Sequence, residues 1–275
     1  MIVDAHQHFW NLETGSYPWL TPEAGVLYRT YRPEDLAPEL AAAGVEATVL
    51  VQAADSYQET DSMLALADAH DFIAGVVGWV PLTRPDETGE ALERYRGHPR
   101  FSGVRHLIHD EPDPDWVVQD TVLESLGLLA EAGLTFDVVS LLPRHLDHVV
   151  TIAERHPTLR IVIDHLSKPS IKDHVWEPWA SGLARAAACP NVYAKVSGLV
   201  TEADHANWTV EDLRPYVDYA VETFGPERLM AGSDWPVALL AADYQTVWRV
   251  TSALLSGTDR DLVLGGTAAR FYGFS

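Results

Sequence analysis

The sequence predicts a single-domain (β/α)8 barrel over residues 1–275, and three observations favour this fold. Eight short apolar segments rich in β-branched residues alternate with eight segments of helical periodicity, without a linker, charge block or low-complexity tract between them. Most of the apolar segments are continuously hydrophobic, as parallel strands buried on both faces are. The length of 275 residues fits one barrel in which crossover helices join parallel strands.

The apolar segments expected to form strands are residues 2–5, 47–52, 73–80, 103–107, 135–139, 160–164, 192–196 and 229–232. The segments expected to form helices are residues 33–43, 60–69, 86–96, 121–132, 143–155, 176–188, 210–224 and 244–255. Gly44, Gly133 and Gly225 follow helical segments, where a left-handed residue commonly ends a helix. Pro33 and Pro143 stand at expected helix starts, where proline is favoured.

A doubly wound open sheet is the competing fold. For its usual nucleotide ligand it needs a glycine-rich phosphate turn after an early strand, and the sequence has neither a G-x-G-x-x-G nor a Walker motif. Residues 9–31 depart from the strand–helix repeat and form a long aromatic loop after the first strand. This loop either covers a ligand or packs on its own side chains, which include Trp10, Tyr17, Trp19, Tyr28 and Tyr31.

Composition excludes several classes of function. The chain has 19 Lys and Arg against 40 Asp and Glu, a net charge of −21, so its field repels nucleic acids and anionic membranes. The single cysteine, Cys189, excludes an intrachain disulfide and a thiolate-rich metal site. No apolar run approaches the roughly 18 residues of a membrane span, and no secretory signal pattern is present. We therefore expect a cytoplasmic protein; nothing in the sequence specifies an oligomeric state.

Two histidines, His6 and His8, flank one residue at the end of the first expected strand. Residues two apart on a strand point the same way, so their imidazoles can converge on one ion. His165 and Asp234 follow strands six and eight, whose carboxyl ends meet at the same end of a barrel. A lone strand-end histidine more often packs than ligates. Three imidazoles and a carboxylate, however, are ligand types that suit zinc or a similar divalent ion, so this set is the expected site of at most one ion, with zinc as the first choice.

Other polar or aromatic side chains at strand ends form a candidate substrate site. The candidates are Gln52, Trp79, Arg105, His106, Lys168, Lys195 and Trp235, with His109, His174 and His205 as minor candidates for the pocket rim. Structural alternatives remain open: Arg105 as an ion-pair partner, Gln52 as a partner of backbone groups, Trp79 as a core residue. Lys195 is one of three lysines and lies inside an apolar strand, which favours a specific role. Asp4 and Asp164 are expected to orient metal ligands.

Seven motifs, in order along the chain, resemble the sugar-lactone hydrolases of the amidohydrolase superfamily, typified by L-fuconolactonase and L-rhamnonolactonase. They are D-A-H-Q-H-F-W at 4–10, V-Q-A-A at 51–54, G-V-V-G-W-V at 75–80, G-V-R-H at 103–106, D-H-L-S-K-P at 164–169, K-V-S-G-L at 195–199 and G-S-D-W-P-V at 232–237. The resemblance implies a (β/α)8 barrel with a strand-one His-x-His pair. It also implies that Asp234 accepts a proton during the reaction.

The implied reaction is hydrolysis of a five- or six-membered aldonolactone to the open sugar acid, with Asp234, His165, His106 and Arg105 as catalytic candidates. Asp234 would take a proton from water and return it to the leaving hydroxyl, while cations stabilise the oxyanion. Relatives of this branch differ in whether turnover needs a metal, so a metal-assisted and a metal-free version both stand. The bridging carbamylated lysine or glutamate of binuclear relatives is missing unless Asp137 or a displaced lysine serves, so we expect at most one ion.

Two alternatives accompany this reading. The first is non-oxidative decarboxylation of an aromatic acid, which relatives in the same superfamily perform with histidines and an aspartate at these strand ends. Activity on aryl carboxylates without activity on lactones would favour it. The second is a non-catalytic sugar- or metal-binding barrel, which a ligand would stabilise without turnover.

Overall fold

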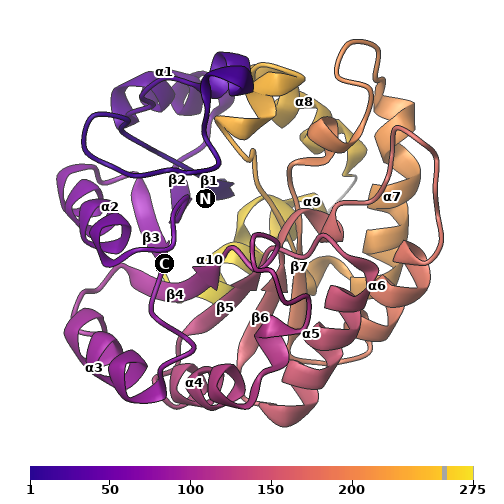
Figure 1. Ribbon diagram of the computed structural model, residues 1–275. Helices are drawn as coiled ribbons and strands as arrows, with labels where there is room; N and C mark the ends of the chain where they lie inside the picture. The colour runs from indigo at the N-terminus through magenta and orange to yellow at the C-terminus, as the bar shows by residue number, and fades with distance from the viewer. Residues whose placement is uncertain (256–258, 275) are drawn as a thin grey trace.

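The computed structural model describes residues 1–255 and 259–274 and confirms the (β/α)8 barrel. Figure 1 shows the strands at the centre with the helices arranged around them, seen from the end that carries residues 9–31. Neighbouring strands are parallel and follow the chain order from the first to the eighth. The strands are β1 Val3–Gln7, β2 Ala47–Val51, β3 Ile73–Gly78, β4 Phe101–His106, β5 Thr135–Val138, β6 Arg160–Ile163, β7 Val192–Val196 and β8 Leu229–Ala231.

The ring of strands closes between β1 and the segment after β8. Gln7 and Trp235 form a parallel bridge, His8 N donates to Trp235 O at 2.8 Å, and Asp234 N donates to His6 O at 2.8 Å. The Asp4 carboxylate accepts from the backbone N–H of Ser233 at 2.8 Å, across the same junction. Because β1 continues to Gln7, His6 lies within the strand rather than after it. Closure therefore brings Asp234 beside the His-x-His pair.

The helices are α1 Pro33–Ala43, α2 Tyr57–Ala69, α3 Pro85–Tyr95, α4 Asp120–Glu131, α5 Pro143–Arg155, α6 Trp179–Ala187, α7 Val210–Phe224, α8 Tyr244–Leu254, α9 Asp259–Asp261 and α10 Thr267–Tyr272. The bounds of α1, α5 and α7 agree with the sequence prediction. Helix α6 begins after Pro178 instead of at Trp176, because proline disfavours helical geometry in the residue before it. Gly44 and Gly133 have φ of 70° and 71°, the left-handed conformation expected after a helix.

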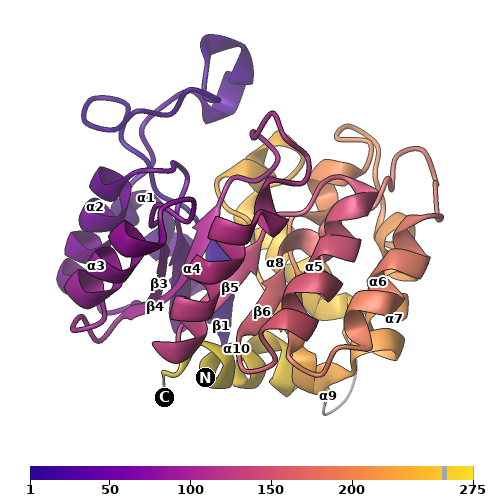
Figure 2. The ribbon, with the colours of Figure 1, turned by 60° about the horizontal axis from the view of Figure 1, so that its bottom comes forward.

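The carboxyl-terminal segment covers the amino-terminal end of the barrel and was not predicted. Phe271 and Tyr272 of α10 pack in one cluster with Val3, Val49 and Met230 from the barrel interior. Figure 2 shows α10 at the end opposite to residues 9–31. This leaves the carboxyl ends of the strands as the open face. In the described part of the chain, no helix is long and apolar enough to cross a bilayer.

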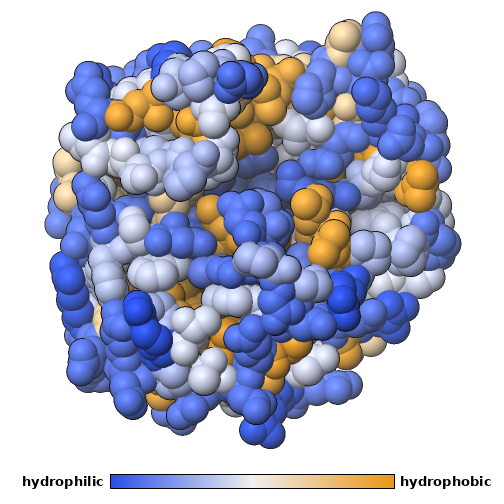
Figure 3. Space-filling view, in the orientation of Figure 1, coloured by the Kyte–Doolittle hydropathy of each residue, from blue (hydrophilic) through white to orange (hydrophobic). Residues whose placement is uncertain are grey.

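The loop at residues 9–31 rises above the strand ends at the open face (Figure 2). Its two ends are joined by an antiparallel bridge between Trp10 and Tyr31. The Trp10 ring packs edge to face with Trp19 at 5.3 Å and with Tyr31 at 5.4 Å between centroids. The loop therefore does pack on its own aromatic side chains. The same face is mostly hydrophilic, with separate hydrophobic patches (Figure 3).

Candidate active site

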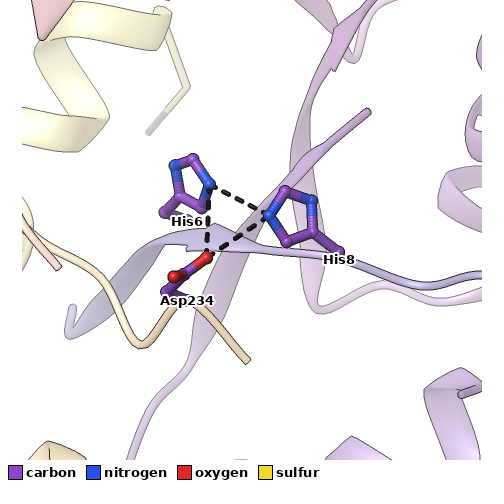
Figure 4. A group of neighbouring side chains, drawn as sticks. All are labelled: His6, His8 and Asp234. Carbon is purple, nitrogen blue, oxygen red and sulfur yellow. Dashed lines mark hydrogen bonds and ion pairs between the residues drawn. The ribbon is translucent and has the colours of Figure 1, made fainter. Parts of the chain in front are cut away.

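At the open face of the barrel the structure gathers His6, His8 and Asp234 in one metal-sized cluster, and the fourth predicted ligand, His165, lies beside Asp234 in a second cluster with His6 and Asp164. The Nε2 atoms of His6 and His8 are 3.1 Å apart. Asp234 Oδ1 lies 3.8 Å from His6 Nε2, 3.4 Å from His8 Nε2 and 3.8 Å from His165 Nε2. Figure 4 shows the imidazole of His6 in β1, the imidazole of His8 directly after β1 and the carboxylate of Asp234 after β8 pointing toward one another. All four side chains are buried.

The spacings among His6, His8 and Asp234 would suit three ligands of one zinc ion. Ligand atoms at about 2.1 Å from a tetrahedral zinc are about 3.4 Å from one another, and the measured separations run from 3.1 to 3.8 Å. The other ring nitrogen of each histidine has its own partner: His8 Nδ1 donates to Val51 O at 2.7 Å, and His165 Nδ1 lies 2.9 Å from Ser197 Oγ. Such partners hold the ring so that Nε2 faces the ion.

Unusual backbone conformations aim two of these side chains inward. His165 and Asp234 have φ of 53° and 58°, in the left-handed region that side chains rarely adopt. Such residues cost about 1–3 kcal/mol each and cluster at functional sites. Gly198, with φ of 62°, leaves the space they need, because a Cβ there would lie 2.7 Å from His165 Nδ1 and 2.8 Å from Asp234 Oδ2. The sequence contained Gly198 in a motif but offered no role for it.

Burial sets the protonation of the site. It lowers the pKa of His165 to about 4 and lowers the pKa values of His6 and His8 below their ordinary value. The imidazoles are therefore neutral near pH 7, the form that binds a metal. Burial by itself raises the pKa of Asp234, but the attraction of His165 and the contact with His8 outweigh it, so this pKa is lowered and the carboxylate is ionised.

A buried cluster of charged side chains lies beneath His6. Asp164 Oδ1 is 3.3 Å from His6 Nδ1 and 3.1 Å from Lys195 Nζ, and Asp164 Oδ2 accepts from Arg105 Nη1 at 3.1 Å. Burial raises the pKa of Asp164, but the Lys195 ammonium outweighs it and holds this pKa well below its usual range. His6, Asp164 and His165 also form a metal-sized cluster. Because two cations already neutralise its carboxylate, we expect one ion and not two.

Lys195 does not lie where a substrate contact requires. Its side chain is fully buried, donating to Asp137 Oδ2 at 2.6 Å and lying 3.0 Å from His6 Nδ1. The hydroxyl of Tyr272 in α10 donates to the same Asp137 oxygen at 2.7 Å. Lys195 was expected to contact substrate, but the structure encloses it under His6 and outside the residues that line the cavity.

A cavity of about 140 Å³ opens beside the four ligands. It is lined by His8, Trp10, Trp19, Ala53, Arg105, Leu107, His109, Asp110, Val139, His165, Lys168, Asp234 and Val237. Of the expected substrate contacts, Arg105 and Lys168 reach this cavity, as does the minor candidate His109. Arg105 Nε is buried without a hydrogen-bond partner among the described residues. Trp10 and Trp19 come from the loop, where the sequence left their role open.

His106 and Trp79 are held by each other instead of lining the cavity. Trp79 Nε1 donates to His106 Nδ1 at 3.0 Å, so His106 Nε2 carries the hydrogen that goes to Glu111 Oε1 at 2.7 Å. The His106 ring stacks on Trp116 with 3.9 Å between centroids. With both nitrogens engaged, the ring has no free group for an oxyanion, contrary to the role expected for it.

Gln52 and Trp235 are likewise occupied by the protein. Gln52 is fully buried, and its Nε2 donates to Asp55 Oδ1 at 2.7 Å and to the backbone oxygen of Arg105 at 3.2 Å. Trp235 packs edge to face on Tyr31 at 5.1 Å. Both side chains stabilise the rim of the barrel and neither lines the cavity, which differs from the expected substrate contacts.

A barrel that gathers imidazoles and a carboxylate at the carboxyl ends of its strands has the architecture of an enzyme. Residues 3–274 match the amidohydrolase family, and the chain belongs to this family.

The chain is 39% identical over 98% of its length to an L-fucono-1,5-lactonase of Burkholderia ambifaria, covering 94% of that protein. It is 38% identical over 98% of its length to an L-fucono-1,5-lactonase of Burkholderia multivorans, covering 95% of it. A crystal structure of a Burkholderia multivorans amidohydrolase with bound zinc superposes with a TM-score of 0.94, at 36% identity and with full coverage of both chains.

Proposed function

We propose that this chain hydrolyses a sugar-derived aldonolactone of the L-fucono-1,5-lactone type to the open sugar acid, as a step of carbohydrate catabolism. The observation that carries the proposal is the ionised carboxylate of Asp234 among three neutral imidazoles in the wall of a small pocket. The names of the two relatives at 38–39% identity support the choice of lactone. The single cysteine, which allows no intrachain disulfide, favours a reducing compartment such as the cytoplasm.

In the proposed reaction, the oxygen of water attacks the lactone carbonyl carbon while Asp234 takes its proton. The bond between the carbonyl carbon and the ring oxygen then breaks, and Asp234 returns the proton to that oxygen. Arg105, which lines the pocket, would stabilise by its positive charge the oxygen on which negative charge develops. His6, His8, His165 and Asp234 would hold one zinc ion, which supplies Lewis-acid polarisation of the carbonyl.

The pocket suits a ligand with one apolar and one polar side. Val139, Val237 and Leu107 contribute apolar surface, while Lys168 and Asp110 offer groups that can bind hydroxyls. A neutral lactone is not repelled by a chain of net charge −21, whereas the carboxylate product is. The charge of the protein thus favours release of the product.

The test is a pH-indicator screen of acid release from fuconic, rhamnonic, galactonic, arabinonic and xylonic lactones, with and without a chelator. We expect acid release above the spontaneous rate, fastest with the L-fucono-1,5-lactone, and a bound-zinc signal that the chelator removes. A fall in rate with the chelator would favour the metal-assisted version, and an unchanged rate the metal-free one. Two further assays discriminate the alternatives.

Loss of CO2 from aryl carboxylates, without acid release from any lactone, would favour the decarboxylase. Stabilisation of the protein by sugar lactones or zinc without turnover of either substrate class would favour a binding protein. Either result would overturn the proposed lactonase activity.

A further inference from the structure

We propose that Trp19 contacts the lactone ring through the face of its indole and that Glu59 positions Trp19; this inference rests on the proposed function. Trp19 lies on the loop that rises above the open face (Figure 2) and lines the cavity beside Asp234. Its side chain is 36% exposed, although it is large and apolar. The sequence places Trp19 in an aromatic loop whose role it leaves open, and it offers no role for Glu59.

The surroundings of Trp19 leave only its ring available. Its Nε1 donates to the backbone oxygen of Ala53 at 2.8 Å, at the end of β2. Trp10 packs against it at an interplanar angle of 89°, and Trp10 Nε1 donates in turn to Arg29 O at 2.7 Å. Trp19, and to a much smaller extent the buried Trp10, therefore present apolar ring surface to the cavity. The C–H face of a sugar ring packs on such a surface, while its hydroxyls need the polar side of the pocket.

Glu59 of α2 accepts the hydrogen bonds that fix the surroundings of Trp19. Its carboxylate is 5% exposed and accepts from Ala53 N at 3.0 Å and from the Tyr17 hydroxyl at 2.9 Å. Ala53 is thus bound by Glu59 through its N–H and by Trp19 through its carbonyl. A buried carboxylate destabilises the protein unless it accepts hydrogen bonds. Glu59 accepts one bond from Tyr17, in the loop that contains Trp19, and one from Ala53, whose backbone oxygen accepts the bond from Trp19.

These bonds matter because a space separates part of the loop from α2, and a further hydrogen bond between the two runs from Gln58 Nε2 to Thr14 O at 2.7 Å. A second cavity of about 230 Å³ lies between the loop, α1 and α2, lined by Trp10, Tyr17 and Glu59 among others. Trp10 lines both cavities, so it separates the space behind the loop from the catalytic pocket. Hydrogen bonds to Glu59 and Ala53 then fix the position of Trp19, and their loss would let the indole move.

The first test compares Trp19→Ala and Trp19→Phe with Trp176→Ala. Trp176 is a matched control, since it is 37% exposed on a loop at the same end of the barrel and packs on Trp179 without lining the pocket. Loss of the aromatic contact should raise KM for the lactone about tenfold in Trp19→Ala. We expect kcat to change little, Trp19→Phe to recover most of the affinity, and Trp176→Ala to match the wild type.

The second test addresses positioning through Tyr17→Phe, Glu59→Ala and Glu59→Gln. The first two should raise KM and speed backbone hydrogen exchange across residues 10–20, whereas Glu59→Gln keeps an oxygen for Ala53 N and should stay near the wild type. If Glu59→Ala does not fold, Tyr17→Phe, which loses a single hydroxyl, carries the test. Unchanged exchange in the folded variants would overturn the role of Glu59.

Different results would overturn the proposed lactonase function and the proposed role of Trp19. A wild-type protein that opens no lactone overturns the proposed function and this inference together. Normal wild-type turnover with equal KM values in Trp19→Ala and Trp176→Ala overturns this inference alone. A loss of kcat without a change in KM would also contradict it, because a substrate contact made by the loop acts mainly on binding.

Discussion

At the scale of single residues, Asp234 must supply an ionised carboxylate and must also adopt a left-handed backbone conformation. Asparagine is the substitution that keeps the shape and tolerates φ of 58°. We expect Asp234→Asn to remain folded and to lower kcat for acid release by about 10²- to 10⁴-fold, since the proton acceptor is lost. Turnover and thermal unfolding measured together check this prediction. Retention of most of the activity would remove Asp234 from its assigned role.

Gly198 is required for the same site because of the space it leaves. In Gly198→Ala, the new methyl group would collide with His165 and Asp234, so we expect zinc affinity to fall about 10- to 100-fold. Zinc content after dialysis measures it. Gly44→Ala is the control: Gly44 has φ of 70° with nothing near its Cβ, so it should lose about 1–2 kcal/mol of stability and keep its zinc. Equal zinc content in both variants would contradict the steric explanation.

At the scale of elements, β5, β6 and β7 meet through one buried charge cluster around Lys195. Lys195→Met would leave Asp137 and Asp164 without their ammonium, and we expect a loss of about 3–5 kcal/mol in the free energy of unfolding. Urea denaturation measures this loss. The exposed Lys172→Met should change stability by less than about 0.5 kcal/mol. Adding Asp137→Asn to Lys195→Met should recover part of the loss; no recovery would argue against a charge effect.

The start of α5 depends on pH through His145. Its Nδ1 accepts from Leu141 N at 3.2 Å and from Leu142 N at 3.4 Å, and burial lowers its pKa to about 4. Because this pKa is about 6.5 in the unfolded chain, the unfolded state takes up the proton first. The stabilisation is therefore complete above pH 6.5 and decreases as the pH falls toward 4.

Urea unfolding between pH 7.5 and 4.5 measures this decrease. We expect a shallower slope in His145→Gln, whose amide keeps an acceptor but does not titrate in this range. His205→Gln, a change in an exposed loop, should leave the slope as in the wild type. Parallel slopes for the wild type and His145→Gln would show that other groups govern the acid range.

At the scale of the whole molecule, the net charge of −21 opposes compactness. Raising NaCl from 10 to 150 mM shortens the screening length from about 30 Å to about 8 Å. We therefore expect the Tm to rise with NaCl over this range, as followed by thermal unfolding at pH 7.5. Sucrose at matched osmolality controls for general solvent effects. A Tm that falls with salt would mean that attractive ion pairs outweigh the repulsion.

The barrel could be predicted from the sequence because each of its strands and crossover helices has its own local sequence pattern. The apolar runs, the prolines at helix starts and Gly44 gave bounds for α1, α5 and α7 that the structure confirms. The short α10 was missed, since six residues are too few for a clear helical period. Its place against Val3 depends on packing inside the barrel, which no local pattern encodes.

The candidate site likewise contains residues that the sequence predicted and contacts that only the structure revealed. Spacing on one strand and the position of strand ends sufficed to nominate His6, His8, His165 and Asp234, because alternation along a strand and the geometry of a barrel are general. Only the tertiary structure decided that Lys195 lies under His6, that His106 is tied to Trp79, and that Trp19 reaches the pocket. Those contacts join residues far apart in the chain, so their partners are selected by packing and burial once the barrel has closed.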